Sequence, residues 1–569
     1  MPACLAERAS RKRAFMLSPL AAAIAMSVAG TAGAFELDTG NPDLAIRWDN
    51  TVRYNVGVRT RDAGTVGNNP QFDEVEYRFP NRGDVVTNRV DLLTEADLVY
   101  QSRHGARISA AGWYDDAYSD GMAHRNPALL SVPGSYVNDQ YTDYTKRYYR
   151  GPSGELLDAF VFTGFDLGDV PVSLKLGRHT VYWGESLFSF VHGVSYAQAP
   201  VDIGKATATP GTEAKELFRP LNQLSLSSQV TNDLTVAGQY FLDWESARFT
   251  EGGTFLGSAD FVFNGPQQVF AGALFRNGGV ATPDKRGDFG LAARWSPAWL
   301  DGTAGAYYRN FTDKLPAVLR TGTVYKQYYG ENIDLFGLSL TKQVAGISVG
   351  SEISYRWNMP LLSSTLGSTA GAQLIDNSYQ ARGNTWHALI NAIGSISRTP
   401  LWDSATYTGE LVFSRWDKVT KNAQMFFGEG SSFICNGRAL NASTGTVQNA
   451  SVGCATKDYV GLNLGFTPTW LQVLPGVDLS MPLSYSRGLS GNAAVTLGGN
   501  EGNGSYSIGL GADVYSKYRF DLRFVDYFGD AVLRPQPLMP GAMQVVAVNG
   551  ASTALKDRSS VTLTFKTTF

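Results

Sequence analysis

The 569-residue sequence is poor in the residues that usually build catalytic and metal centres. It contains three cysteines and five histidines, and no two histidines have the H-x-x-x-H spacing of a zinc site. The triplet Gly184-Glu-Ser186 lacks the second glycine of the G-x-S-x-G nucleophile elbow, because residue 188 is a phenylalanine. We therefore expect no metal, no cofactor and no enzymatic activity.

Long apolar runs and an excess of positive charge are missing as well. Beyond the N-terminal region, no segment offers the roughly 20 consecutive apolar residues that a membrane-spanning helix needs. Charged residues make up only 17% of the chain, and the formal net charge is -3. Without a basic surface, nucleic acid is not an expected partner.

The chain does begin with the features of an export signal. Four basic residues between positions 8 and 13 precede an apolar stretch from Ala14 to Ala29, and Ala32-Gly-Ala34 provides the small residues that a signal peptidase recognises. Cys4 lies ahead of the apolar stretch instead of at the cleavage site, which argues against a lipoprotein. We predict a signal peptide over residues 1–34, cleaved after Ala34, and export across the inner membrane of a Gram-negative bacterium.

The last nine residues, Val561–Phe569, alternate apolar with polar side chains and end on an aromatic residue. Because successive side chains of a strand point to opposite faces, the odd positions from 561 to 567 would face lipid and the even positions from 562 to 566 would face a lumen. A terminal Phe569 on such a strand resembles the signal read by the bacterial barrel-assembly machinery, which is therefore an expected partner. The alternative is an ordinary amphipathic edge strand.

The same alternation recurs along the mature chain. Over 44–58, apolar residues such as Trp48 share one parity and polar residues such as Arg53 share the other, and similar runs occupy 90–100 and 347–355. Aromatic residues make up 12% of the chain, and the mean hydropathy is -0.14. A lipid-facing band, aromatic girdles and a polar lumen would average to such a value.

Short and long connections alternate between these runs, as they do in outer-membrane barrels with short periplasmic turns and long extracellular loops. Short connections lie near 102–105, 168–170, 231–233 and 344–346, and long ones near 60–88, 119–155, 185–221, 246–286, 358–384 and 418–457. We predict a single all-β domain over residues 35–569. It is a transmembrane antiparallel β-barrel in the outer membrane with about 18 strands, or alternatively about 16 or 14.

Charged residues of both signs share the inward parity of the first strands. They are Arg47, Asp49, Arg53, Arg89, Asp91, Glu95 and Asp97. We expect these side chains to line a wet lumen and to form ion pairs there, or merely to fill and stiffen it. An ion-selective porin would show a lining of one sign, so the mixed lining argues against strong selectivity.

The alternation is interrupted near Gly177, and a segment rich in glycine, alanine and proline follows over 184–222. A glycine-centred bulge that shifts the parity would explain the interruption. Because the segment is too aromatic for a purely solvated loop, we predict that it folds into the barrel as a constriction; a packed cap that only stiffens the loop is the alternative. The predicted passage is lined by Arg178, His179, Tyr182, Trp183, Glu185, Phe188, Phe190 and Phe218.

Five separated stretches resemble the proteobacterial domain-of-unknown-function family 1302. They are Trp48–Tyr54, Gly177–Phe188, Pro210–Leu217, Ser354–Pro360 and Arg382–His387. The family consists of predicted outer-membrane proteins, often encoded beside a second exported protein and an RND-type transporter. The resemblance implies movement of hydrophobic molecules across the outer membrane, with a periplasmic protein and an RND-type transporter as partners, but it implies no site residues. The chain departs from the commonest family form at His179, where glutamine is expected.

Two cysteines remain after the signal peptide, Cys435 and Cys454, inside a stretch rich in serine, asparagine and glycine. In an oxidising, exported location they most simply form one disulfide across a surface loop. A metal site at this pair would lack nearby histidines.

Three functions remain in play at this point. The first is an outer-membrane channel for passive uptake or transfer of hydrophobic compounds such as steroids, terpenes, fatty acids or alkanes. The second is a general or weakly selective porin, and the third is an outer-membrane partner of an RND-type lipid export or envelope-maintenance system. Outer-membrane lipid and lipopolysaccharide would surround the barrel in each case. One enzymatic alternative, a phospholipase that pairs Ser186 with His179 or His387, stays open.

Overall fold

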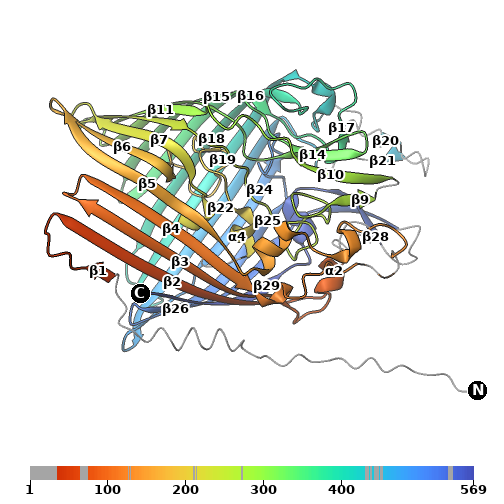
Figure 1. The fold of residues 1–569 in the computed structure, drawn as a ribbon, viewed down its shortest axis with the longest axis horizontal. Helices are drawn as coiled ribbons and strands as arrows, with labels where there is room; N and C mark the ends of the chain where they lie inside the picture. Colours follow the sequence, from red (N-terminus) through yellow and green to blue (C-terminus); the bar gives the residue numbers. More distant parts are fainter. Residues whose placement is uncertain are drawn as a thin grey trace, which may run out of the picture.

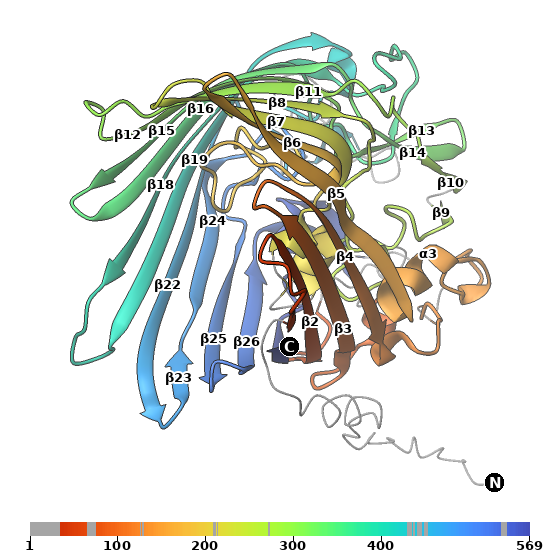
Figure 2. The same ribbon diagram turned by 60° about the vertical axis from the view of Figure 1, so that its left-hand side comes forward.

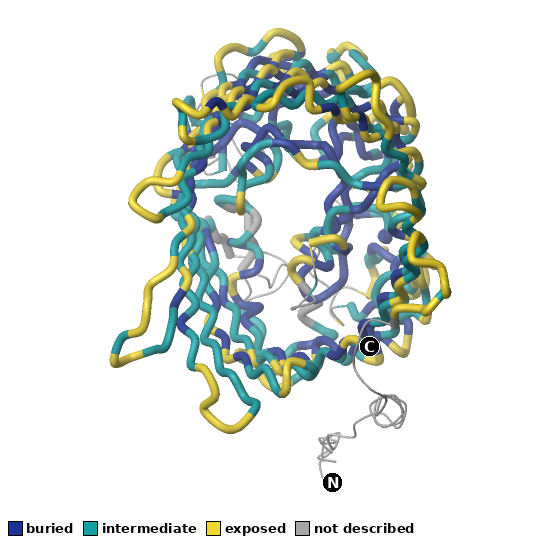
Figure 3. Tube along the Cα trace, turned by 90° about the vertical axis from the view of Figure 1, so that its left-hand side faces the viewer, coloured by how far each residue is buried: buried dark blue, intermediate teal, exposed yellow. Residues whose placement is uncertain are grey.

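A computed structural model describes residues 35–64, 75–125, 127, 130–208, 212, 214–270, 273–429, 435, 439–440, 447–448, 453–535 and 543–569. The predicted signal peptide, residues 1–34, lies outside the described residues. The chain after it folds mainly into β-strands, which form a ring in Figure 3.

A single antiparallel sheet closes on itself to form the barrel (Figures 1 and 2). Its strands are β2 (Leu44–Arg59), β3 (Val85–Tyr100), β4 (His104–Asp115), β5 (Ser153–Leu167), β6 (Val170–His179), β7 (Leu221–Gln229), β8 (Leu234–Phe241), β11 (Phe289–Trp295), β12 (Gly302–Phe311), β15 (Ile333–Val344), β16 (Ile347–Pro360), β18 (Arg382–Ile396), β19 (Ser404–Lys421), β22 (Asp458–Leu474), β23 (Val477–Ser480), β24 (Leu483–Gly491), β25 (Gly504–Val514), β26 (Tyr518–Phe528) and β29 (Ser560–Thr568).

Closure comes from the first and last of these strands. β2 pairs with β29 from Thr51 opposite Thr568 to Arg59 opposite Ser560, and Phe569 exchanges two further backbone hydrogen bonds with Asn50. β23 and β24 share one place in the wall, because both pair with β22 and β25. The barrel therefore has 18 strands, as the alternation predicts. The short β1 (Phe35–Leu37) continues the row of β29 along β2.

Short turns and long loops alternate around the ring. The turns at 101–103, 168–169, 230–233 and 345–346 are short, whereas the connections at 116–152, 180–220 and 242–288 are long. The loops at 312–332, 492–503 and 529–559 add to those expected from the sequence. Because the strand number is even, the start of β2 and the end of β29 lie at the same, short-turn end of the barrel.

The two faces of the strands differ as a membrane barrel requires. On β29, Thr562 and Thr564 are buried while Leu563 between them is 45% exposed. On β2, Arg53 and Asn55 are buried on the inward face. Apolar side chains on the outer face and polar ones in the lumen are what lipid outside and water inside demand. The chain is therefore a transmembrane β-barrel.

Further elements lie in the long loops. A five-stranded sheet is built from three of these loops in the order β17, β13, β14, β10, β9 and lies at the long-loop end of the barrel, on the right in Figure 1. Its strands, with the remaining short strands and helices, are β9 (Gln268–Phe270), β10 (Leu274–Val280), β13 (Ala317–Thr321), β14 (Val324–Tyr328), β17 (Gly367–Ser368), β20 (Ala439–Leu440), β21 (Val447–Gln448), β27 (Ala531–Pro535), β28 (Met543–Val548), α2 (Val75–Arg78), α3 (Asp143–Thr145), α4 (Ile203–Ala208), α5 (Ala214–Leu217), η1 (Asp116–Tyr118), η3 (Val137–Asp139), η4 (Lys146–Arg150), η5 (Ala423–Met425) and η6 (Ala551–Leu555). In the part of the chain that the structure describes, no helix is long and apolar enough to cross a membrane.

The bulge predicted at Gly177 is wrong. β6 pairs with β5 and with β7 in a continuous register through this residue, and the register shift lies instead between Ile108 and Ala110 in the pairing of β4 with β5. Gly177 has a φ of +122°, and a Cβ there would strike the carbonyl oxygen of Ala159. The glycine therefore permits a close approach of two strands rather than a change of parity.

Candidate functional site

The connection between β6 and β7, residues 180–220, turns into the barrel, and we call it the lumen loop (Figure 2). Residues 185–194 contact inward-facing side chains of the wall formed by β12–β22. Residues 202–216 contact β2, β3 and β5 on the other side of the ring. The loop therefore crosses the lumen from one wall to the opposite one.

A buried carboxylate on β16 holds the start of the lumen loop. Glu352 accepts hydrogen bonds from the backbone N–H groups of Glu185, of Ser186 at 3.2 Å and of Val194 at 2.7 Å. Gly184 precedes this turn with a φ of +94°, and a Cβ there would collide with the Glu352 carboxylate. A negative charge surrounded by backbone donors is a strong anchor, because hydrogen bonds to an ionised acceptor exceed neutral ones.

A second carboxylate repeats this arrangement two strands further along, since β18 lies between β16 and β19. Glu410 on β19 accepts from the N–H groups of Leu187 at 2.6 Å, Phe188 at 3.2 Å and Ser189 at 2.7 Å. Three successive N–H groups converging on one anion form a backbone nest. Glu352 and Glu410 together fix the loop from 185 to 194 against the wall.

Two buried arginines bind the carbonyl groups of the same stretch. Arg309 on β12 donates to the carbonyl oxygens of Val194 at 2.9 Å and Tyr196 at 2.5 Å. Arg356 on β16 donates to the carbonyl oxygen of Gly193 at 3.0 Å. The Tyr196 hydroxyl donates to Asp313 at 2.6 Å. The wall thus matches donors and acceptors along the loop backbone.

A pair of buried histidines closes this set of contacts. The Nδ1 atoms of His192 on the loop and His387 on β18 lie 2.9 Å apart, and His192 Nε2 lies 2.8 Å from the carbonyl oxygen of Gly498. Since a carbonyl only accepts, His192 carries a proton on Nε2. In the neutral pair His387 Nδ1 therefore donates to His192 Nδ1, and the Thr385 hydroxyl, 2.9 Å away, donates to His387 Nε2.

Acid is expected to weaken this attachment. Burial lowers the pKa of His192 to about 4, whereas a detached, solvated histidine has a pKa of about 6.5. As the pH falls, His192 is protonated in the detached loop before it is protonated in the attached loop. The free energy of attachment therefore keeps its full value above about pH 6.5 and falls by about 2 kcal/mol by pH 5. The charged and titratable groups that face His192 are His387, Arg356 and Tyr459, and Arg356 further opposes its protonation.

Conductance recorded in planar bilayers between pH 7 and pH 5 checks this expectation. We expect larger current fluctuations as the pH falls in the unmodified protein. His192→Gln keeps a polar group in place but does not titrate, and it should remove most of that change. An identical pH profile for both proteins would contradict the assignment.

Ion pairs hold the other end of the lumen loop to the opposite wall. Arg53 on β2 bonds Glu216 in α5 at 2.9 Å, and Lys215 pairs with Glu95 on β3. In α4, Lys205 pairs with Glu155 on β5 at 3.1 Å. These pairs are buried or half-buried, so removing one partner would leave an uncompensated charge in the lumen.

At the end that is attached to Glu410, the loop presents apolar side chains to the lumen. Leu187 is 40% exposed and Phe188 is 44% exposed, although their backbone N–H groups are bonded to Glu410 on the inner face of the wall. Their side chains therefore face the interior of the barrel rather than the membrane. Tyr182, 45% exposed, packs edge-on against Phe218 with ring centroids 4.7 Å apart.

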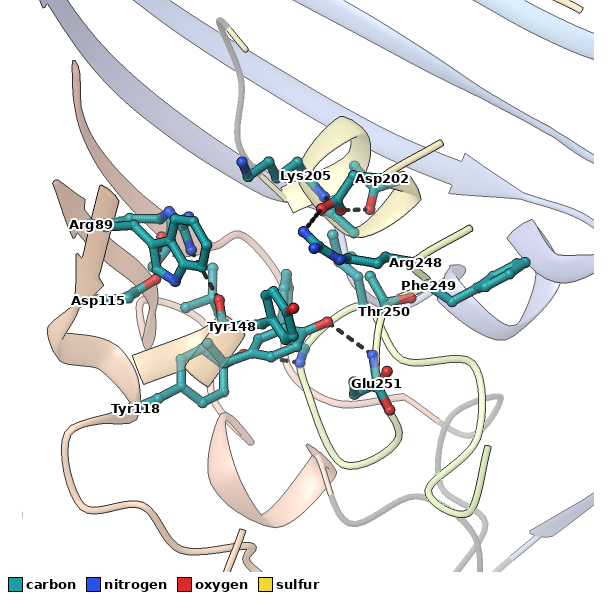
Figure 4. Close-up of a pocket in the computed structure, with 18 of the residues that line it drawn as sticks. Arg89, Asp115, Tyr118, Tyr148, Asp202, Lys205, Arg248, Phe249, Thr250 and Glu251 are labelled. Carbon is teal, nitrogen blue, oxygen red and sulfur yellow. Dashed lines mark hydrogen bonds and ion pairs between the residues drawn. The ribbon is translucent and has the colours of Figure 1, made fainter. Parts of the chain in front are cut away.

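A cavity of about 90 Å³ lies beside α4, between the lumen loop and the inward faces of β3, β4, β26 and β29 (Figure 4). Segments of the loops at 116–152 and 242–288 complete its wall. Eight aromatic side chains line it: Trp113, Tyr118, Tyr144, Tyr148, Tyr149, Phe249, Phe255 and Tyr527. An apolar-walled pocket with a few polar groups is the usual form of a small-molecule site.

Charged side chains pack on the rings of this cavity. Trp113 and Tyr148 stack with centroids 5.9 Å apart, and Trp113 has the Arg89 guanidinium at 5.5 Å and the Lys205 ammonium at 5.0 Å. Arg248 lies 4.4 Å from the Tyr148 ring centre. Cations over aromatic faces stabilise both partners and hold the rings in fixed orientations.

The whole-chain comparison decides the family. The family described as "Protein of unknown function (DUF1302)" matches residues 15–569. The chain belongs to this family. The five stretches that resemble it in the sequence thus lie in a DUF1302 protein, and four of them contain residues that hold the lumen loop: Arg53, Glu216, Arg356 and His387.

Three solved structures with low sequence identity to this chain come from two bacteria. OccAB1 of Acinetobacter baumannii is 11% identical, with a TM-score of 0.42 over 95% of this chain and 98% of that chain. OpdK of Pseudomonas aeruginosa, solved with vanillate, is 10% identical, with a TM-score of 0.41 over 92% and 98%. OccK2 (OpdF) of P. aeruginosa, solved with glucuronate, is 9% identical, with a TM-score of 0.38 over 92% and 98%. No curated protein matches the chain.

The structure places most of the predicted passage residues on or beside the lumen loop. His179 ends β6 on the inward side and lies 2.7 Å from the Ser225 hydroxyl. Trp183 stacks on Tyr307, and Glu185 lies 3.4 Å from the Ser339 hydroxyl. Tyr182, Phe188 and Phe218 are in the positions described above, and Phe190 packs partly buried against the core around Trp183.

Arg178 lies elsewhere than predicted. Because the register of β6 is unbroken, Arg178 shares the outward parity of the exposed Leu176 and does not line the passage. It donates to Glu245 at 2.8 Å, a carboxylate that also binds Arg219. This pair links the end of β6 to the loop between β8 and β11.

The charges predicted for the lumen form a network on the β2–β5 wall. Arg89 pairs with Asp91 at 2.9 Å, and Arg53 lies 3.7 Å from Asp91. Arg107 pairs with Asp97 at 3.0 Å and with Glu95. Asp49 is half-buried and Arg47 is exposed, both toward the short-turn end of β2.

Sequence reasoning missed the side chains that hold the lumen loop on the far wall. These are Glu352, Glu410, Arg309 and His387 in its anchoring role. Their one signal is parity, since Glu352 and Arg356 fall on the polar side of an alternating run. Nothing in that pattern indicates which residues of a distant loop they bind.

The structure also describes the residues of the remaining site predictions. Cys435 and Cys454 form a disulfide with their Cα atoms 6.0 Å apart. Among the described residues, no cluster of His, Cys, Asp and Glu could hold a metal ion. The Ser186 hydroxyl has no hydrogen-bond partner in the described chain, while His387 and His179 are engaged with other groups. The phospholipase arrangement of Ser186 with a histidine is therefore not present.

Proposed function

We propose that this barrel is an outer-membrane channel for passive passage of hydrophobic organic compounds such as steroids, terpenes, fatty acids or alkanes. The observation that carries the proposal is the lumen loop, which crosses the barrel and presents Leu187 and Phe188 to the interior. Exposing two large apolar side chains to water costs free energy. An apolar solute that covers these side chains during passage removes them from water and so recovers this free energy.

A water-filled pore would give such a solute little advantage. Lipopolysaccharide hinders its entry through the outer leaflet, and an open aqueous lumen offers no apolar contact. A loop anchored at both ends instead supplies apolar side chains inside the barrel, in addition to the aromatic cavity. An open lumen of mixed charge would serve a general porin, so the crossing loop favours the hydrophobic-compound channel.

Polar substitution of the exposed pair tests the proposal. In Leu187→Ser with Phe188→Ser, we expect uptake of a labelled lipophilic compound to fall roughly tenfold, because about 1.5 kcal/mol or more of apolar contact is lost. The single-channel ion conductance should change little, since both backbone N–H groups still bind Glu410.

A matched control changes an exposed leucine outside the lumen. Leu401 is 69% exposed in the turn between β18 and β19, and Leu401→Ser should leave uptake unchanged. Equal uptake by the Leu187/Phe188 variant and the unmodified protein would contradict the proposal. Growth of a deletion strain on steroids, terpenes, fatty acids and alkanes would identify the substrate class, and unimpaired growth on all four would favour the porin.

Location and partners form part of the same proposal. The mature chain would begin after Ala34, reach the outer membrane through the barrel-assembly machinery, and work with a periplasmic protein and an RND-type transporter. The closed barrel, in which β29 pairs with β2, supports the outer-membrane location. Membrane fractionation with N-terminal sequencing tests it, and recovery in the periplasmic fraction would contradict it. Co-purification of a periplasmic protein after cross-linking tests the partnership with that protein.

A further inference from the structure

The charges that line the aromatic cavity are compensated within the protein. Arg89, Lys205 and Arg248 are its cations, and each is paired, with Asp91 at 2.9 Å, with Glu155 at 3.1 Å, and with Glu155 at 2.6 Å and Asp202 at 3.2 Å. Asp115 is held by the Thr87 hydroxyl at 2.8 Å and by two backbone N–H groups. Three cations thus face four carboxylates, and no positive charge is left for an anionic ligand.

The fifth carboxyl group of this region, Glu251, adds no charge at neutral pH. It belongs to the loop between β8 and β11, and burial raises its pKa to about 8. Its Oε2 accepts from the N–H group of Gly265 at 2.6 Å, so the group is held as part of the loop structure. The electrostatics of the cavity therefore disfavour a carboxylate ligand and favour a neutral one.

Hydroxyl groups in the cavity have unused hydrogen-bonding capacity. Within the described part of the chain, the side-chain hydroxyls of Tyr148, Tyr527 and Thr562 form no hydrogen bond, and none of them is sealed away from solvent. By contrast, the hydroxyls of Tyr118 and Tyr149 accept backbone N–H groups at 3.2 Å and 2.9 Å. Tyr148, Tyr527 and Thr562 come from three separate segments of the chain and line one space. A ligand with a hydroxyl or carbonyl group could bond to them without displacing a protein contact.

The size and the walls of the cavity indicate the size and the apolar character of the rest of the ligand. Its volume of about 90 Å³ is of the order of cavities that take up a benzene-sized ring. Ring edges and apolar side chains such as Val86 and Leu256 form the walls. Aromatic edges contact a flat apolar molecule favourably.

We propose that this cavity binds a ring of an uncharged lipophilic compound that carries a hydroxyl or carbonyl group, and that it rejects the corresponding carboxylate. The inference rests on the proposed function, because it names the part of the hydrophobic substrates that the channel selects. Tyr148 and Thr562 bind the oxygen of the ligand, and the aromatic wall binds its ring. The cavity beside α4 then selects the substrate before the substrate reaches the apolar residues of the lumen loop.

Equilibrium dialysis with the purified, detergent-solubilised full-length barrel tests the proposal. The probes are phenol, which is neutral at pH 7, and benzoate, which has the same ring and a negative charge. Tyr148→Phe with Thr562→Val removes two hydroxyls and changes side-chain volume little. Both samples contain the same detergent, so its uptake of the probe cancels in the comparison. We expect the unmodified protein to bind phenol about tenfold more tightly than the variant, since each lost hydrogen bond weakens binding by roughly threefold to tenfold.

A control variant removes a hydroxyl from the outer face instead. Tyr54 on β2 donates to Asn88 at 2.7 Å outside the lumen, and Tyr54→Phe should bind phenol like the unmodified protein. Equal binding by the Tyr148/Thr562 variant, equal binding of benzoate, or no protein-dependent binding of phenol would each overturn the proposal. Because dialysis does not depend on conduction, a barrel that binds phenol but transports no lipophilic compound would contradict only the proposed function.

Discussion

Replacing residues 188–218 with a short Gly/Ser linker is expected to raise the single-channel conductance roughly threefold or more, because an unobstructed barrel of this strand number encloses an aqueous channel. The lumen loop crosses that space and is tied to both walls, at Glu410 and at Arg53. The barrel wall itself does not need the loop, since β6 and β7 pair directly from Val172 opposite Ser228 to His179 opposite Leu221. Recordings in planar bilayers give the conductance.

The control for this replacement alters an element that belongs neither to the barrel wall nor to the lumen loop. The hairpin of β13 and β14, residues 317–328, belongs to the separate five-stranded sheet of the long loops. Shortening it should change the conductance much less than replacing the lumen loop. A heat-dependent shift in electrophoretic mobility would show that both variants still form closed barrels. Unchanged conductance after loop replacement, in a folded barrel, would rule out the constriction.

The double substitution Glu352→Gln with Glu410→Gln is expected to release the loop without shortening it. Each carboxylate accepts three backbone N–H groups, whereas a glutamine amide has one accepting oxygen and an NH₂ group that only donates. At least one N–H group at each site then loses its partner, at a cost of about 1–3 kcal/mol per site. The change in side-chain volume is negligible, so a loss of attachment reflects the hydrogen bonds.

Hydrogen exchange measures this release directly. The amides of residues 185–189 and 194 should exchange roughly 30-fold faster or more in the double variant. The lost hydrogen bonds destabilise the attached loop by at least about 2 kcal/mol, which raises the population of the detached loop by that factor. Asp403 provides the control: it also accepts a backbone N–H group, from Leu471 at 2.9 Å, but it lies in the short turn between β18 and β19. Asp403→Asn should leave exchange in the lumen loop unchanged. Protection that persists in the double variant would show that other contacts hold the loop.

The membrane barrel and its strand number were within reach of the sequence. Side-chain direction in a strand reverses at every residue, so a run such as 44–58 reveals its inner and outer faces without knowledge of any other strand. The alternation of short turns with long loops is equally local, and it orders the strands around the ring. The one local error, the bulge at Gly177, arose because a single glycine can mark either a bulge or a close approach of two strands. Only the position of Ala159 across the sheet distinguishes the two.

The composition of residues 184–222 indicated a segment folded into the barrel, but not how it is held. The carboxylate of Glu410 lies more than two hundred residues from the amides it binds, and the histidine contact joins residues 192 and 387. Such pairs depend on the curvature of the wall and on the course of the loop across it. Parity placed Glu352 and Arg356 on a polar face and could say nothing more.

The amino-acid order alone determined that this chain is a barrel with a polar inside and an apolar outside, because that property follows from the two-residue repeat of each strand. The tertiary structure alone decided what fills the barrel. The anchors of the lumen loop and the unpaired hydroxyls of Tyr148 and Thr562 are brought together only after 18 strands have closed on themselves. Closure turns separate polar faces into one lining, and the chemistry of that lining depends on distances that no single segment contains.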